Sequence, residues 1–300
     1  MTQKGRHSSP IQHGFPHLET VRQSLTALFR RLSADGVRSY DTSFAPADAA
    51  FGPSDDLHLG AHRVASSMVR ALRLPEARMV VGFRAMEEAA TVELTAGPEY
   101  FIEVNDRFRV HRRDLAAALA HEVTHVLLHR LDLRFPTIAA NEILTDTAAA
   151  YLGAGWLLLD AYREDELTHQ KLGYLTPEEF GYVLAKRGRL LGEDLSAWFT
   201  SPQAYEAYVR GRALADQDLR RAPLAAAGRP ERRRYLRDRR AGGTAPGHGA
   251  AYRFEEPGPG GELRVSFPCP VCEQRLRLPA HAGPLRARCG LCHTVLECDT

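Results

Sequence analysis

Cysteine is missing from most of this 300-residue sequence. The first 268 residues contain none, and all five cysteines lie in the last 32 residues. A secreted domain held together by disulfides would not usually gather its cysteines in this way, so that class of protein is disfavoured. Thiols clustered at one end of a chain indicate a metal site in a reducing compartment. We therefore expect a cytoplasmic protein.

Long hydrophobic runs are missing as well. No stretch approaches the run of about 18 apolar residues that a membrane span needs, so we expect no membrane-embedded segment. Residues 1–16 lack the apolar core of a secretory signal and are expected to form a disordered tail. Apolar residues make up 44% of the chain and charged residues 25%, which is typical of a globular protein with a buried core.

The net charge of +2 conceals a strongly basic segment. Residues 220–240 contain nine arginines against two acidic residues, so this segment carries +7 and the rest of the chain −5. Such a segment can attract nucleic acid, an anionic surface or a protein partner electrostatically. It can also be a solvated helix or a basic linker. We favour a solvated helix or a basic linker over a binding role, because Tyr235 is its single aromatic residue and no stacking pattern is present.

Hydrophobic periodicity predicts a mostly helical α+β chain with few strands. Apolar residues at three- and four-residue spacing indicate amphipathic helices, and short β-branched and aromatic runs indicate strands. Thr176, Pro177 and Glu179 form a strong helix start, with a capping threonine and a capping-box glutamate. The helices are expected at residues 17–34, 59–73, 111–131, from 141 onward and 202–217, and the strands at 79–83, 91–95 and 100–104.

Composition divides the chain into a large and a small domain. Residues 17–218 are expected to form the large, mostly helical domain with a small antiparallel sheet. A linker rich in arginine, glycine and proline follows at residues 219–262. The small domain, residues 263–300, is too short to fold on apolar burial alone, so we expect a metal ion to stabilise it.

One stretch of the large domain, His121-Glu-Val-Thr-His125, has the spacing of a metal chelate. Residues four apart on a helix project from one face, so both imidazoles can reach a single zinc ion. Glu122 is displaced by about 100° around the helix. Its carboxylate would lie beside the metal, in the position of a general base that removes a proton from a metal-bound water. The alternative is a metal-free histidine pair, at the surface or hydrogen-bonded in the core.

A catalytic zinc ion usually has a third protein ligand. His129 lies too far around and along an unbroken helix, and we interpret it as a helix C-terminal residue favoured by the dipole. Glu142 and Asp146 are better candidates, because they share one face of a strongly apolar helix. Burying a carboxylate on such a helix is unfavourable unless it has a hydrogen-bonding or metal partner. The alternative for these acids is a solvated first helical turn.

Taken together, HEVTH at 121–125 and NEILTD at 141–146 resemble the gluzincins, the thermolysin-like zinc metallopeptidases. In that family, H-E-x-x-H is followed by N-E-x-x-S/T-D on a second helix. The resemblance covers up to half of the chain, and residues 100–104 fit an exposed edge strand that could hold an extended peptide. Only sixteen residues separate His125 from Glu142, a short connection that implies a minimal gluzincin domain.

The resemblance implies a role for each matched residue. His121, His125 and Glu142 would be the zinc ligands, and Glu122 the general base for hydrolysis by a metal-activated water. Asp146 would accept a hydrogen bond from His121 and fix its tautomer. The family motif also implies that Asn141 helps to shape the site.

A donor to the developing oxyanion is needed in such chemistry. The sequence leaves this role open among three downstream residues, although a structural role is favoured for each: His169, Tyr174 and Tyr182.

The small domain contains a four-thiolate pattern, with Cys269 and Cys272 in one C-x-x-C pair and Cys289 and Cys292 in another. The spacing is typical of a zinc ribbon, in which two knuckles close on one tetrahedral structural zinc ion. Cys298 is left over, and we interpret it as a small apolar residue on the last strand. Ribbons bind nucleic acid, bind proteins or only cap a fold, so the pattern leaves the function open.

These patterns favour a zinc-dependent peptidase with one catalytic and one structural zinc ion, acting on a peptide or a specific intracellular protein. One alternative is a catalytically inactive peptidase-like scaffold that regulates by binding nucleic acid or protein through residues 220–240 and the ribbon. Another is a metal-dependent hydrolase of a non-peptide amide. Glu122 distinguishes the first alternative, because an inactive scaffold need not keep the base.

Overall fold

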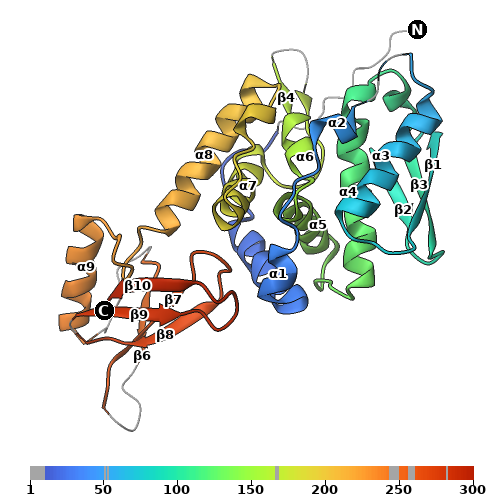
Figure 1. Cartoon of the computed structure of the whole chain (residues 1–300). Coiled ribbons are helices and arrows are strands. Elements are labelled where there is room, and N and C mark those ends of the chain that lie inside the picture. The colour runs from blue at the N-terminus through green and yellow to red at the C-terminus, as the bar shows by residue number, and fades with distance from the viewer. Residues whose placement is uncertain are drawn as a thin grey trace. The chain divides into compact units, whose positions relative to one another are not determined.

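A computed structural model of the chain describes residues 11–50, 52, 54–165, 169–242, 250–255, 261–281 and 283–300. The fold is α+β, as the sequence predicts, and it divides into two compact units (Figure 1). The first unit comprises the described residues of Met1–Ser24 and Arg38–Arg212, and the second those of Leu25–Val37 and Ala213–Thr300. Within the described ranges, no helix combines the length and apolar character needed to cross a bilayer.

Most of the first unit is helical. Its centre is the neighbouring pair α4 and α5. Helix α4 is mostly buried, and α5 is buried from Ile143 onward. Helix α4 also packs against α3 and α6, and α5 against α7. Two helices, α1 (Leu18–Arg38) and α8 (Pro202–Asp218), contribute residues to both units. The remaining helices of this unit are α2 (Pro46–Ala49), α3 (Leu57–Ala71), α4 (Leu115–Arg130), α5 (Ile138–Leu152), α6 (Trp156–Asp160) and α7 (Pro177–Leu191).

A three-stranded sheet in the order β1–β3–β2 packs beside α3 and α4. Strand β2 (Ala90–Glu93) runs antiparallel to β3 (Glu99–Asn105), whereas β1 (Arg78–Arg84) runs parallel to it, so the sheet is mixed. The expectation that residues 100–104 form an edge strand is wrong, because β3 is hydrogen-bonded on both sides. The edges of the sheet are β1 and β2.

Helix α5 begins at Ile138, three residues before the expected start at Asn141. Thr137 caps it, since its side chain accepts a hydrogen bond of 3.2 Å from the Ala140 N–H. Glu142 therefore lies beyond the first turn, and a solvated first turn does not explain its carboxylate. The capping box predicted at the start of α7 is confirmed, with reciprocal side-chain and backbone bonds between Thr176 and Glu179.

Short elements complete the first unit. A two-stranded antiparallel ribbon follows α6, and 3₁₀ turns precede α4 and α8. These elements are β4 (Arg163–Glu164), β5 (His169–Gln170), and the turns Asp106–Arg109, Arg112–Asp114 and Ser196–Trp198.

Of the predicted N-terminal tail, residues 1–16, the first ten lie outside the described residues. Gly14 is bonded to the start of α7: its N–H donates to Glu178 at 3.1 Å, and its carbonyl accepts from Thr176 at 2.6 Å.

The second unit is built around antiparallel strands (Figure 1). They form one sheet in the order β6–β7–β8 and one pair β9–β10. The strands are β6 (Arg253–Glu255), β7 (Arg264–Pro268), β8 (Arg275–Pro279), β9 (Pro284–Arg288) and β10 (Val295–Asp299). Residues 219–262, for which a linker is predicted, include helix α9 (Arg229–Arg240) and strand β6, while residues 243–249 and 256–260 lie outside the described part.

Candidate metal centres

Helices α4 and α5 bring three potential ligands together from separate parts of the sequence. His121 and His125 project from one face of α4, and Glu142 faces them from α5. The two histidine Nε2 atoms lie 3.0 Å apart. The Oε2 atom of Glu142 lies 3.1 Å from Nε2 of His121 and 3.4 Å from Nε2 of His125. The three atoms thus form a small, nearly equilateral triangle.

The size of this triangle matches a tetrahedral zinc site. Bonds of about 2.0–2.2 Å from zinc to nitrogen or oxygen place neighbouring ligand atoms about 3.3 Å apart. The observed separations of 3.0, 3.1 and 3.4 Å bracket that value. Two nitrogens and one oxygen also form a donor set that zinc accepts in catalytic sites. The residues therefore fit a metal ion in their present geometry.

The three candidate ligands are more exposed to solvent than the ligands of a closed structural site. His121 is buried, whereas His125 and Glu142 keep part of their surface exposed. A catalytic zinc ion has three protein ligands and an open position for water or substrate. Partial exposure beside a three-residue donor set meets that requirement.

Asp146 holds His121 in place from one turn further along α5. Its Oδ1 atom accepts a hydrogen bond of 2.8 Å from Nδ1 of His121, which leaves Nε2 free to bind a cation. The other oxygen, Oδ2, accepts backbone N–H groups from Tyr174 and Leu175. This wholly buried carboxylate therefore joins the histidine to the loop that leads into α7.

His125 has a comparable support that the sequence analysis missed. The Thr145 hydroxyl donates to the Asn141 carbonyl at 2.9 Å, so it is available to accept from Nδ1 of His125, 3.3 Å away. The threonine thereby directs Nε2 of His125 toward Glu142. The available signal was the position of Thr145 in NEILTD, directly before Asp146.

The electrostatics of the cluster favour a positive charge among the three ligands. Burial alone would lower the pKa of His121, but hydrogen bonds to Asp146 and Glu142 outweigh it and raise the pKa well above its usual value. Burial would raise the pKa of Glu142, yet the two histidines lower it to about 2. A pocket that stabilises a protonated histidine beside an ionised carboxylate also stabilises a metal cation, which displaces the proton.

Glu122 follows His121 on α4 and is buried. Burial raises the pKa of this carboxyl above its usual value, while the nearby charges of His121 and His125 act in the opposite direction. A carboxylate with a raised pKa accepts a proton more readily near neutral pH, as a general base must.

The other sequence candidates occupy different places. Asn141 bonds the backbone of Phe135 through both its amide atoms, at 2.7 and 2.8 Å, and so fixes the loop before α5. His129 lies exposed in the last turn of α4, outside the ligand group. His169 is near Glu164 on the β4–β5 ribbon. Tyr182 is fully buried on α7.

Tyr174 is the one oxyanion candidate that lies at the cluster. Its ring stacks against the His121 ring, with centroids 6.3 Å apart and planes inclined by 25°. The side chain is 53% exposed, and its partial burial together with the charge of Glu142 raises the pKa of the phenol. The hydroxyl is therefore protonated at neutral pH and can donate a hydrogen bond.

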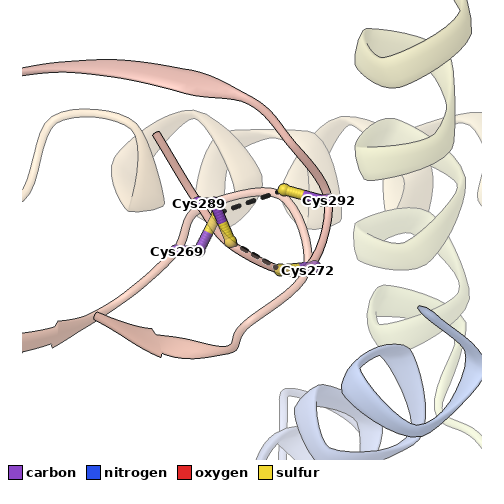
Figure 2. A group of neighbouring side chains, drawn as sticks. All are labelled: Cys269, Cys272, Cys289 and Cys292. Atoms are coloured by element: carbon purple, nitrogen blue, oxygen red, sulfur yellow. Dashed lines mark hydrogen bonds between the residues drawn. The ribbon is translucent and has the colours of Figure 1, made fainter. Parts of the chain in front are cut away.

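The second candidate centre comprises the four ribbon cysteines, whose side chains converge in Figure 2. The Sγ atoms of Cys269 and Cys292 lie 3.6 Å apart, as do those of Cys272 and Cys289. Zinc–sulfur bonds of about 2.3 Å place thiolates about 3.8 Å apart in a tetrahedron, so the cluster could bind a zinc ion. All four residues are fully buried, as is typical of closed, structural zinc sites.

Two similar knuckles hold these cysteines. In each, the N–H of the first cysteine donates to the carbonyl five residues later, at 2.9 Å in both cases. Glu273 and His293, which directly follow the second cysteines, adopt φ angles of 60° and 63° to close the turns. The sequence did not predict that α1 also contacts a knuckle: the Thr26 hydroxyl donates to the Cys272 carbonyl at 2.8 Å.

Comparisons of the chain with protein-family models, with curated proteins and with solved structures found no match.

Proposed function

We propose that the first unit is a zinc-dependent peptidase of the gluzincin type. The observation that carries the proposal is the triangle of His121, His125 and Glu142, with Asp146 bonded to the outer nitrogen of His121. The residues that the resemblance matches as zinc ligands are also the residues whose ligand atoms lie close together in the structure, which supports the proposal. A second zinc ion, bound by the four ribbon cysteines, would have a structural role.

A zinc ion at this centre would supply Lewis acidity and lower the pKa of a water molecule. Glu122 would take the proton from that water and deliver it to the leaving amine. Asp146 and Thr145 would hold the two imidazoles in the orientations that ligation needs. Tyr174, neutral and exposed beside the cluster, would donate a hydrogen bond to the developing oxyanion.

A peptide could approach along strand β2. This strand packs against α4, and its side away from β3 is an edge of the sheet. Backbone N–H and C=O groups at such an edge can pair with an extended peptide. The proposed substrate is therefore an extended segment of a peptide or protein chain.

A direct test compares the wild-type protein with Glu122→Gln on a degenerate peptide library, with mass spectrometry as the readout. We expect the wild type to cleave peptides and the variant to lose activity by at least about a hundredfold, since it lacks the base. Zinc content and circular dichroism should be the same in both proteins. Equal cleavage by the two would eliminate Glu122 as the base.

A further inference from the structure

Helix α9 in the second unit carries seven arginines and two acidic residues. Its inward face is fixed by Tyr235, which is 1% exposed. The Tyr235 ring packs edge-on against Tyr252 at a centroid distance of 5.0 Å and is stacked on Phe254 at 5.4 Å. This aromatic cluster determines which side of the helix faces solvent.

Both acidic residues of α9 lie on the same side of the helix as Tyr235 and accept hydrogen bonds there. The Glu231 carboxylate accepts the Ala222 N–H at 3.1 Å, and Asp238 accepts the Tyr252 hydroxyl at 2.7 Å. They lie at nearly the same helical angle as Tyr235, to within about 60°. The acids therefore do not neutralise the outer face.

Four arginines form a line along that outer face, and we call them the arginine stripe: Arg229, Arg233, Arg237 and Arg240. Their spacing of four, four and three residues places them within about 80° of helical arc, over a length of about 16 Å. All four are exposed, and their side chains form no hydrogen bond or ion pair with another residue in the described part of the chain. Like charges at this spacing repel one another, so the stripe lowers the stability of the helix unless an anion binds it.

We propose that the arginine stripe binds the phosphodiester backbone of a nucleic acid. A nucleic-acid strand presents regularly spaced anions in a line, and guanidinium groups bind phosphate through two parallel hydrogen bonds. Such contacts give affinity without base recognition, so no stacking residue is required on the helix. The inference is independent of the proposed peptidase activity.

Two other anionic partners fit less well. A helix that lies on a membrane inserts an apolar face into the lipid, but α9 has no exposed large apolar side chain. A protein interface usually centres on a buried apolar or aromatic anchor, and Tyr235, the aromatic residue of this helix, faces inward. Contacts to a phosphate backbone need no such anchor.

The test uses the full-length protein and a labelled mixed-sequence oligonucleotide, both single-stranded and duplex, with fluorescence anisotropy over a range of salt concentrations. The stripe variant replaces Arg229, Arg233, Arg237 and Arg240 with glutamine. We expect its affinity to fall at least about tenfold at low salt and the log–log salt slope to decrease by about 3, since each lost phosphate contact removes about 0.7–0.9. A variant with lysine at the four stripe positions should keep most of the wild-type salt slope, because it keeps the four positive charges.

A matched control removes the same number of charges from exposed arginines of the first unit: Arg78, Arg84, Arg107 and Arg134. The control should bind as tightly as the wild type, and circular dichroism should show that both variants fold. Three results would overturn the proposal: no binding by the wild type, equal losses in stripe and control variants, or tighter binding to phosphatidylserine vesicles or polyglutamate than to the oligonucleotide. Because Glu122→Gln should bind the oligonucleotide normally, failure of the peptidase proposal would be recognised separately.

Discussion

Nδ1 of His121 lies 2.8 Å from Oδ1 of Asp146, a residue 25 positions away on the next helix. The same carboxylate accepts two backbone N–H groups from the loop that precedes α7. One buried side chain thus joins the first candidate ligand, His121, to helix α5 and to the loop that carries Tyr174. This relationship makes the geometry of the proposed zinc site sensitive to changes that do not touch a ligand.

Replacing Asp146 with asparagine should weaken zinc binding by about 10–100-fold. The amide cannot accept from His121 on one side and from two backbone N–H groups on the other, so the imidazole loses its fixed orientation. Competition with a chromogenic chelator would measure the affinity. Asp160→Asn is a matched control, because Asp160 is also buried and accepts the backbone N–H groups of Thr200 and Ser201. A similar loss of zinc affinity in both variants would contradict a specific role for Asp146.

A side chain at Gly173 is expected to displace the Asp146 carboxylate. Gly173 adopts a φ of 78°, and an added Cβ would lie 2.6 Å from an Asp146 carboxylate oxygen. Gly192 has a similar φ of 74° but open space around it. Alanine at either position should cost about 1–2 kcal/mol of unfolding free energy through backbone strain.

Only Gly173→Ala should also reduce zinc affinity and peptide cleavage, since it displaces Asp146. Thermal unfolding and zinc titration of the two variants would separate the effects. Unchanged zinc binding in Gly173→Ala would show that the loop does not constrain the site.

Zinc stoichiometry should report the two centres separately. We expect about two zinc ions per wild-type chain, given one four-thiolate site and one three-ligand site. His121→Ala with His125→Ala should leave one, and Cys272→Ser with Cys289→Ser should also leave one. Inductively coupled plasma mass spectrometry of the purified proteins gives the counts. A histidine double variant that keeps both ions would contradict the proposed catalytic site.

Chelation should expose all five cysteine thiols together. Cys298 is 1% exposed on β10, and burial raises the pKa of its thiol to about 11, so it should resist alkylation in the folded protein. We expect the short strands around it to depend on bound metal for their stability. We therefore expect iodoacetamide to label no cysteine in the zinc-loaded protein and five after EDTA treatment. Labelling of only four would mean that the ribbon stays folded without metal.

The arginine stripe should lower the stability of the free protein. Its four arginines form three neighbouring like-charge pairs, each of which destabilises a helix by about 0.2–0.5 kcal/mol at low salt. The glutamine variant of the stripe should therefore be more stable than the wild type by about 1 kcal/mol, an advantage that disappears at high salt. Urea unfolding at two salt concentrations would measure this. A less stable variant would indicate a structural role for the stripe instead.

Spacing along the chain was sufficient to identify both candidate centres. His121 and His125 meet because any α-helix places residues four apart on one face, and each C-x-x-C pair forms a local turn. The capping box of Thr176 and Glu179 was predictable for the same reason, since all its bonds are local. The position of β3 between β1 and β2 was not predictable, because strand order depends on long-range pairing that the sequence pattern does not encode.

The sequence by itself therefore determined the chemistry that the chain can offer: two imidazoles, carboxylates on a second helix, four thiolates and a basic segment. Only the tertiary structure decided which of these groups meet. It packs α4 against α5, so that Glu142 completes the triangle, and it brings Tyr174 rather than His169 or Tyr182 to the cluster. It also turns Tyr235 inward and the arginine stripe outward. The physical reason is that burial of apolar surface fixes how the elements pack, and packing sets the distances between groups far apart in sequence.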